Sequence, residues 1–151
     1  MSEHHAQIDW SRAGGDFSLG GFSRDHQVRF GTGQALKLSA TSEYRGNDER
    51  VNPEELLLAA LSSCHMMTFL ALAARSGVLV DAYRDDSVGY LEKGAEGRVA
   101  LARVRLRPRV TFADGATPTL EAQRALHDKA HRGCFIANSV KTAVEVELET
   151  T

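Results

Sequence analysis

The chain has 151 residues and a mass of 16.5 kDa, which is the size of one domain. Hydrophobic residues make up 42% and charged residues 25%, an ordinary globular composition that argues against disorder. A formal net charge of −2 gives no basic excess for nucleic acid or a membrane surface, and two cysteines exclude a disulfide-rich scaffold. Residues 1–10 lack the basic start and apolar run of a signal peptide, so we expect a cytoplasmic protein.

Glycines separate short segments in the first part of the chain, and this pattern predicts an antiparallel meander of strands. The expected strands are Gln7–Arg12, Asp16–Leu19, His26–Phe30 and Ala35–Thr41. The polar stretch Glu43–Arg50 is expected to be a loop. Residues 1–50 are therefore expected to be the N-terminal strands of one domain that spans residues 1–151.

The clearest predicted helix begins at Asn52, whose side chain can cap the first turn. Pro53 suits the first helical position, and the two glutamates that follow lie near the positive end of the helix dipole. Gly77 is a typical residue to end such a helix. We therefore predict a helix over residues 52–76.

The middle of this helix, residues 56–74, is apolar on nearly all faces. Four polar residues interrupt it: Ser62, Ser63, His65 and Thr68. These polar residues argue against a lipid-exposed span, so no membrane partner is expected. A helix with this pattern has to be covered on several sides by sheet, by another helix or by a second subunit.

Residues 78–151 are expected to hold further strands and a second helix. The expected strands are Val78–Tyr83, Ser87–Glu92, Arg98–Phe112 and Thr142–Glu149, with a turn at Gly94-Ala95-Glu96-Gly97. Pro108 lies inside the long third strand, which indicates an edge or a bulge there. The second helix is expected from Thr119 to about His131.

Two charged stripes alternate with apolar residues along the expected strands. The basic stripe is Arg103, Arg105, Arg107 and Arg109, and the acidic stripe is Glu145, Glu147 and Glu149. The basic stripe has two interpretations, a surface for an anionic partner or a face that pairs with the acidic stripe on a neighbouring strand. We favour the pairing, and expect no nucleic-acid partner.

The two cysteines are the candidates for chemistry. Cys64 lies in the polar patch of the long helix, where buried polar groups need partners or a function. Cys134 follows His131 and Arg132, and a cysteine near positive charge ionises more easily. A small core residue is the alternative interpretation for each cysteine taken alone.

Residues 52–64, NPEELLLAALSSC, resemble the first signature of the OsmC/Ohr family, the osmotically inducible and organic hydroperoxide resistance proteins. Residues 130–134, AHRGC, resemble its second signature, and the order and separation of the two motifs also match. The resemblance implies an α+β fold in which antiparallel sheets wrap around long central helices in an intertwined homodimer. Phe135 and His65 differ from the better-known members, which places the chain in a side branch.

The resemblance also implies a thiol peroxidase that reduces organic hydroperoxides. It makes Cys64 the peroxidatic cysteine and Cys134 the resolving cysteine, and it makes Glu54 the residue that holds an arginine against the thiolate. Arg24 is the arginine that we expect in this role. The other candidates in the N-terminal region are Arg12 and Arg29. No bound cofactor is expected, and an external dithiol, in the Ohr branch a lipoylated protein, is the implied reductant.

Three alternatives remain open from the residues themselves. Cys64, His65, His131 and Cys134 form a possible zinc set, although adjacent residues on a helix diverge by about 100°. A Cys–His acyl-transfer enzyme would use His127 or His131 as the base for Cys64. A non-catalytic or weakly active OsmC-like binding or stress protein is the third alternative.

Overall fold

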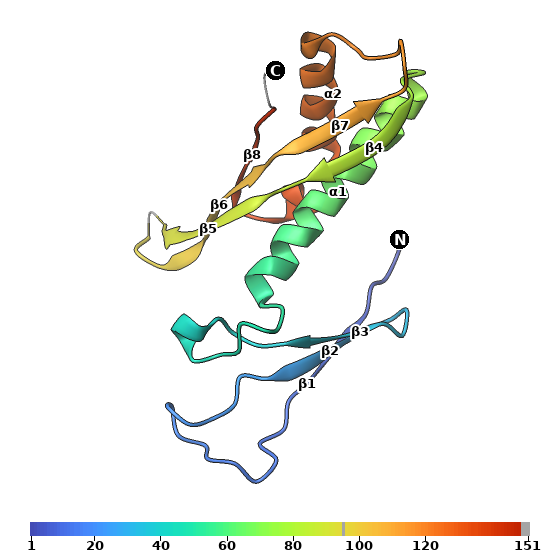
Figure 1. Ribbon diagram of the computed structural model, residues 1–151. Coiled ribbons are helices and arrows are strands. Elements are labelled where there is room, and N and C mark those ends of the chain that lie inside the picture. Colours follow the sequence, from blue (N-terminus) through green and yellow to red (C-terminus); the bar gives the residue numbers. More distant parts are fainter. Residues whose placement is uncertain (95, 149–151) are drawn as a thin grey trace. The chain divides into compact units, whose positions relative to one another are not determined.

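The computed structural model describes residues 1–94 and 96–148 (Figure 1). Contacts between residues divide the chain into two compact units, Met1–Leu56 and the part from Leu57 onward. Each unit is described by itself, and the single domain expected over residues 1–151 stays a prediction. Ala95 of the expected turn and Glu149 of the last expected strand lie outside the described residues.

The first unit holds a three-stranded antiparallel sheet, which confirms the predicted meander. Its strands, in the order β1-β2-β3, are β1 (Ala6–Asp9), β2 (His26–Phe30) and β3 (Ala35–Leu38). A strand at Asp16–Leu19 was wrong, because the Asp16 carboxylate accepts a hydrogen bond from the Ser18 backbone N–H at 3.1 Å. Such local side-chain bonds favour turns over ladders. The expected loop after β3 contains a short 3-10 helix, η1 (Ser42–Tyr44).

The long helix α1 (Pro53–Arg75) has the ends that the sequence predicts. The Asn52 side chain accepts from the Glu55 backbone N–H at 2.8 Å, and the Glu55 carboxylate accepts from the Asn52 N–H at 3.0 Å. These reciprocal bonds satisfy two donors at the first turn. Gly77 adopts a left-handed φ of 73°, and the Val78 N–H donates to the Ala73 carbonyl at 2.9 Å, as in a Schellman cap.

By length and composition alone, α1 is apolar enough to cross a membrane, with a mean hydropathy of 1.9. Only 28% of that segment is buried inside the chain. One side of the helix packs inward, and its buried residues follow every fourth position: Leu61, His65, Phe69 and Ala73. This spacing is that of a core helix with one inward stripe.

The second unit contains two small sheets. One pairs β4 (Val80–Asp85) with β7 (Pro108–Phe112) in antiparallel fashion. The other has the order β5-β6-β8, with β5 (Val88–Lys93), β6 (Val99–Leu106) and β8 (Ala143–Val146). Strands β5 and β6 are antiparallel, whereas β6 and β8 are parallel, so the expectation of purely antiparallel sheets holds with one exception.

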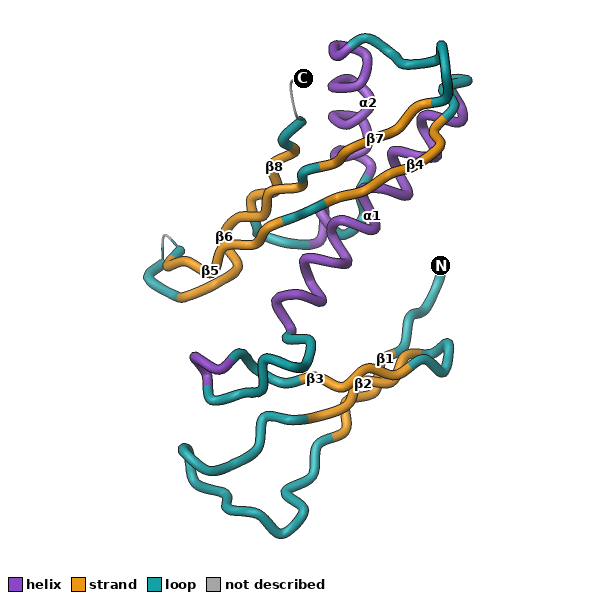
Figure 2. Tube along the Cα trace, viewed as in Figure 1, coloured by secondary structure: helices purple, strands orange, loops and turns teal. Residues whose placement is uncertain are grey.

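The single long strand predicted at Arg98–Phe112 was wrong, because it divides into β6 and β7 at Arg107 (Figure 2). Pro108 has no backbone N–H to donate to a ladder. The N–H of Arg107 donates to the Asp85 carboxylate at 2.6 Å rather than to a neighbouring strand. Neither of these two backbone nitrogens therefore donates to a backbone carbonyl of a neighbouring strand, and the chain passes here from one sheet to the other.

The second helix, α2 (Leu120–Gly133), runs two residues beyond the predicted end at His131. Thr119 is its N-cap, and the Thr119 side chain accepts from the Ala122 N–H at 3.2 Å. A 3-10 turn, η2 (Ala137–Ser139), connects α2 toward β8. Figure 1 shows α1 and α2 behind strands β4 and β7.

Two apolar clusters form the core of the second unit. The first joins both helices to β7 through Phe69, Ala73, Phe112, Leu126 and Ala130. The second joins α1 to β6 through Leu61, Val104 and Leu106. Burial of these side chains contributes roughly 1.5–3 kcal/mol for each large residue, so α1 is held by both sheets and by α2.

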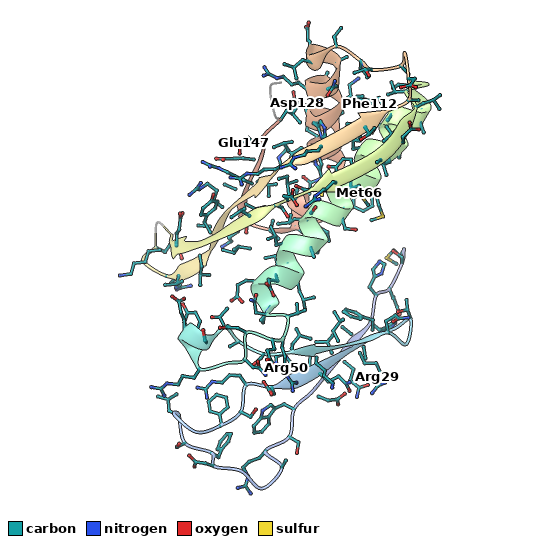
Figure 3. All side chains as sticks on the ribbon, in the orientation of Figure 1. Arg29, Arg50, Met66, Phe112, Asp128 and Glu147 are labelled. Carbon is teal, nitrogen blue, oxygen red and sulfur yellow. The ribbon has the colours of Figure 1, made fainter. Side chains whose placement is uncertain are left out.

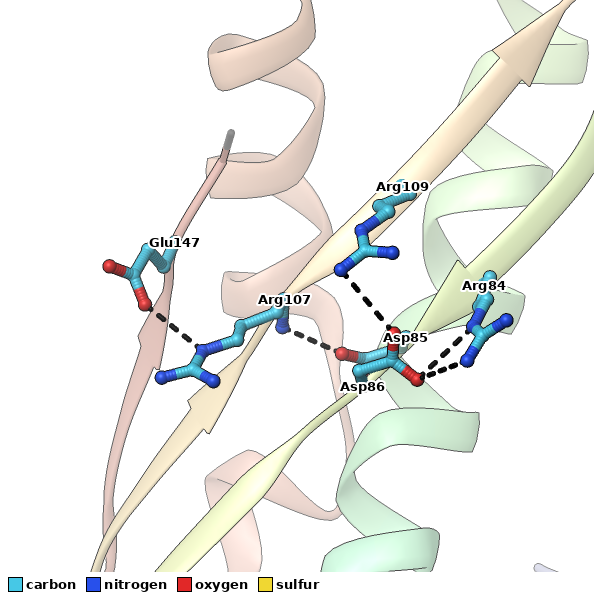
Figure 4. A network of polar contacts seen from close by, with 6 residues as sticks. All are labelled: Arg84, Asp85, Asp86, Arg107, Arg109 and Glu147. Carbon is cyan, nitrogen blue, oxygen red and sulfur yellow. Dashed lines mark hydrogen bonds and ion pairs between the residues drawn. The ribbon is translucent and has the colours of Figure 1, made fainter. Parts of the chain in front are cut away.

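The two charged stripes pair across β6 and β8, as the sequence predicts. Arg105 contacts Glu145 at 3.2 Å. Arg107 contacts Glu147, also at 3.2 Å (Figure 4). The outer arginines also have acidic partners: Arg103 lies 2.9 Å from Glu92, and Arg109 lies 3.5 Å from Asp86. This pairing accounts for the basic stripe without an anionic partner.

Candidate active site

The second unit brings the two cysteines together. Cys64 lies in the middle of α1 and is partly buried, and Cys134 caps the C-terminus of α2 and is only 1% exposed. Both are free thiols, and the Cys64 side chain lies close enough to Cys134 to act on the pKa of its thiol. Seventy residues separate them in sequence (134 − 64 = 70), so this contact depends on the packing of α1 against α2.

The surroundings of Cys134 favour its protonated form. Burial is the largest cause, and together with the neighbouring Cys64 side chain it raises the pKa of the Cys134 thiol. The Ala137 backbone N–H donates to Cys134 Sγ at 3.4 Å and opposes this effect. The raised pKa keeps Cys134 a thiol at neutral pH, whereas Cys64 has the more accessible sulfur.

Gly133 allows the end of α2 to approach α1 closely. A Cβ at this position would lie 3.2 Å from the Thr68 methyl carbon, which is tighter than ordinary contact. The Thr68 hydroxyl in turn donates to the carbonyl of Cys64, one turn earlier, at 2.9 Å. The glycine before Cys134 therefore belongs to the packing that places the two thiols side by side.

The polar patch of α1 is satisfied by two other elements. The Ser62 hydroxyl donates to the Asp85 carboxylate at 2.5 Å, and the same carboxylate accepts from the Arg107 N–H. Figure 4 shows Asp85 at the point where β4 meets the β6–β7 break. About one turn further along the helix, His65 Nε2 and His127 Nδ1 lie 3.0 Å apart. The turn of α1 that carries Cys64 is thus attached both to the sheets and to α2.

Both histidines of this pair are buried, at 1% and 2% exposure. Burial is the main cause that lowers the pKa of each to about 4; nearby histidines, His131 for His65 and His65 for His127, lower it further. From the sequence, His127 was expected only as a candidate base and His65 only as a member of a possible zinc set, so the pairing of the two histidines was not predicted. The one signal in the sequence was the presence of His65 in an otherwise apolar helix.

The three candidate arginines lie in the first unit. Arg24 stacks on the Phe22 ring at 3.8 Å and donates to the carbonyls of Phe22 and Leu19, at 2.5 and 2.8 Å. Arg12 donates to the Gly15 carbonyl, and the exposed Arg29 donates to Gln27, two residues earlier on β2, at 3.4 Å (Figure 3). Arg24 therefore has the most defined environment of the three.

Arg24 also lines a pocket of about 460 Å³ within the first unit. The other lining residues are mostly apolar: Ile8, Trp10, Phe17, Phe22, Ser23 and His26. Glu54 is exposed in the first turn of α1. Because the two units are described separately, the action of Arg24 and Glu54 on Cys64 stays a prediction.

The geometry of the described residues does not favour two of the alternative hypotheses. Among the described residues, no group of three or more His, Cys, Asp or Glu side chains is arranged to hold a metal ion. His127 is hydrogen-bonded to His65 rather than to Cys64, and a pKa of about 4 makes it a weak base at neutral pH. A Cys–His acyl-transfer site built on His127 therefore lacks its central contact.

The model of the OsmC-like protein family matches residues 46–149 of this chain. This match covers more than half of the chain, and it includes Cys64, Cys134 and Glu54. The chain therefore belongs to the OsmC-like family, and the resemblance seen in the sequence is confirmed.

Similar proteins span nearly the whole chain. The structure of an OsmC-like protein of unknown function from Vibrio cholerae is 40% identical, with a TM-score of 0.94 over 99% of this chain and 100% of that one. An organic hydroperoxide resistance protein from Elizabethkingia anophelis has 19% identity and a TM-score of 0.74, over 98% of this chain and 94% of its own. The protein YmaD of Bacillus subtilis is 24% identical over 100% of this chain and 96% of its own length. The fold is thus the OsmC-like α+β fold.

Proposed function

We propose that this protein is a thiol-dependent peroxidase that reduces organic hydroperoxides to alcohols. The observation that carries this proposal is the contact between the Cys64 and Cys134 side chains across α1 and α2. Two free thiols in contact, one accessible and one buried, suit a two-cysteine redox cycle. Membership of a family that includes organic hydroperoxide resistance proteins supports the same chemistry.

The cycle has two chemical steps. The Cys64 thiolate attacks the outer oxygen of the hydroperoxide, so that an S–O bond forms, the O–O bond breaks, and the departing alkoxide takes a proton to become an alcohol. The Cys134 sulfur then attacks the sulfenic acid on Cys64. An S–S bond forms, the S–O bond breaks, and the oxygen leaves as water with the proton of the Cys134 thiol. Two thiols are oxidised and one peroxide is reduced.

The surroundings of the two sulfurs support this assignment of roles. The attacking sulfur has to meet a substrate, and Cys64 is the more exposed cysteine. The resolving sulfur has to stay reduced and shielded until sulfenic acid forms beside it, and Cys134 is buried with a raised pKa.

Arg24 and Glu54 complete the proposed site. A guanidinium near Cys64 would favour the thiolate and donate hydrogen bonds to the departing oxygen. Arg24 lies against an aromatic pocket that suits the apolar part of an organic hydroperoxide. Glu54 would hold the arginine in place by an ion pair.

The oxidised protein requires an external dithiol, and a lipoylated protein is the proposed reductant in the cytoplasm. No bound cofactor takes part in the proposed cycle. The two electrons that reduce the Cys64–Cys134 disulfide come from this dithiol, which itself becomes a disulfide.

A homodimer is the proposed active form. One side of α1 is exposed at every fourth position, and its residues are Ala59, Ser63, Met67, Ala71 and Arg75. The largest apolar side chain of this stripe, Met67, is 58% exposed. Small and apolar residues in such a stripe suit close packing against a helix or sheet of a second copy.

Peroxide consumption by the pure protein tests the function. With a dithiol present, the protein should consume cumene hydroperoxide at least about tenfold faster than hydrogen peroxide, because the aromatic pocket binds only the organic substrate. Cys64→Ser protein is the matched control for uncatalysed loss. A protein that forms the disulfide readily but consumes neither peroxide would favour a non-catalytic role.

A further inference from the structure

The pair of buried histidines between α1 and α2 has no part in the proposed peroxidase cycle. The His65 and His127 rings are nearly parallel, with planes 2° apart and centroids 5.3 Å apart. The Phe69 ring stacks against the His127 ring, with centroids 4.2 Å apart. The pair is therefore enclosed by the core of the second unit rather than placed at a surface.

The surroundings of His65 on α1 and His127 on α2 indicate one hydrogen bond between two neutral imidazole rings. His65 Nδ1 is buried and has no hydrogen-bond partner among the described residues, and a bare acceptor costs less there than a buried N–H. His65 Nε2–H therefore donates to His127 Nδ1. Other titratable groups near the pair include His131 on α2, which acts on His65, and Arg124 and Asp128, which line a pocket with His127. Tyr83 on β4 also lies near His127, and its buried hydroxyl has no hydrogen-bond partner among the described residues.

The histidines lie on the same seam between helices as the thiols. Cys64, His65 and Thr68 lie within little more than one turn of α1, and their respective neighbours at the C-terminal half of α2 are Cys134, His127 and Gly133. Within the described residues, His65–His127 is the one hydrogen bond between nitrogen or oxygen atoms of α1 and α2 side chains. The contact of Phe69 with His127 is a ring contact, and the Thr68 side chain approaches Gly133 through its methyl group.

Apolar contacts are nondirectional and tolerate small slides between helices, whereas a buried hydrogen bond has a required distance and angle. Disulfide formation is equally demanding, because the two Cβ atoms have to come within about 3.5–4.5 Å. We infer that His65 and His127 are positioning residues, whose hydrogen bond holds α1 and α2 in the register that keeps Cys64 against Cys134. This inference rests on the disulfide chemistry of the proposed function.

The effective concentration of the two thiols, measured in glutathione redox buffers, tests this role without any peroxide. His65→Leu and His127→Leu should each lower it by about tenfold or more, because each leaves the other histidine unpaired in the core. The double variant His65→Gln/His127→Asn keeps a side-chain amide near each bonded nitrogen. It should stay within about threefold of the wild type.

Phe112→Leu is the matched control, since it weakens the same apolar cluster without touching the pair. Circular dichroism establishes that each variant is folded. If His65→Leu and His127→Leu fold and keep the wild-type effective concentration of the thiols, the inference is overturned. An equal loss of effective concentration in Phe112→Leu would overturn it too. A wild-type protein that forms only mixed disulfides with glutathione would overturn it as well. Peroxide consumption is measured separately, so failure of the peroxidase proposal alone leaves these outcomes decisive.

Discussion

The Ser62 hydroxyl on α1 donates a 2.5 Å hydrogen bond to the Asp85 carboxylate at the end of β4. The other carboxylate oxygen accepts from the Arg107 N–H at 2.6 Å, at the residue where β6 gives way to β7. One partly buried side chain thus joins the cysteine-bearing helix to the junction of two sheets (Figure 4). Substitution of Asp85 therefore tests how much these two hydrogen bonds stabilise the fold around Cys64.

Asp85→Ala should lower the free energy of unfolding by about 2–4 kcal/mol, because it leaves the Ser62 hydroxyl and the Arg107 N–H without partners. Asp85→Asn should cost less, since the amide oxygen can still accept from Arg107. Urea denaturation measures both. Asp86→Ala is the control, because Asp86 is the next residue and its side chain is 40% exposed, so that its ion pairs contribute little. Equal losses at the two aspartates would contradict the prediction.

The two cysteines should respond differently to substitution. Cys64→Ser should abolish hydroperoxide turnover, whereas Cys134→Ser should allow one round that ends in sulfenic and then sulfinic acid on Cys64. Mass spectrometry after one equivalent of hydroperoxide, and again after a second equivalent that oxidises sulfenic to sulfinic acid, distinguishes these products. In the wild type it should find the loss of two hydrogens and a linked pair of peptides. Identical behaviour of the two variants, with no sulfinic product, would be inconsistent with the assigned roles.

The stability of the fold should fall as the pH decreases from about 6.5 to 4. The pKa values of His65 and His127 are lowered to about 4 in the folded state, so the unfolded chain binds more protons in this range. Each histidine contributes a loss of at most roughly 3 kcal/mol. Chemical denaturation at several pH values measures the slope.

The variant His65→Gln/His127→Asn provides the control for this pH dependence. It lacks both titrating rings, so its free energy of unfolding should change much less between pH 6.5 and 4.5. A wild-type slope that persists unchanged in this variant would assign the effect to other groups.

Gly133→Ala should slow formation of the Cys64–Cys134 disulfide by a few-fold, because the new Cβ would lie 3.2 Å from the Thr68 methyl carbon. Thr68→Ser removes that methyl group and keeps the hydroxyl that donates to the Cys64 carbonyl. The double variant should therefore recover most of the lost rate. Oxidation by diamide, followed by thiol counting, gives the rates, and an absence of recovery would place the cause elsewhere.

The proposed homodimer predicts a composite site. Glu54 and Cys64 are ten residues apart on α1, a rise of about 15 Å, so Glu54 serves the cysteine of the other subunit more easily than its own. Mixed dimers of Cys64→Ser and Glu54→Ala chains should then regain about one working site per dimer. Activity assays after verified subunit exchange measure this. No recovery, or full activity in a monomer by light scattering, would refute the composite site.

Local features of the fold were predictable because they depend on neighbours in sequence. Asn52 and Gly77 marked both ends of α1, since capping uses atoms within one turn. The alternation of Arg105 and Arg107 with apolar residues, matched by Glu145 and Glu147, was enough to predict their pairing. The Asp16–Leu19 segment failed because a side chain of that segment bonds its own backbone, a competition that strand patterns do not reveal.

The sequence by itself determined the family, the two motif cysteines and the helix that carries Cys64, because motif identity and hydrophobic period are local properties. Only the tertiary structure decided which polar side chains from distant parts of the sequence contact each other. The division of β6 from β7 depends on Asp85 taking the Arg107 N–H, and the partner of His65 lies 62 residues away on α2. Such contacts arise from the packing of whole elements, since the directional bond of a buried polar group forms with whatever donor or acceptor the fold brings within about 3 Å.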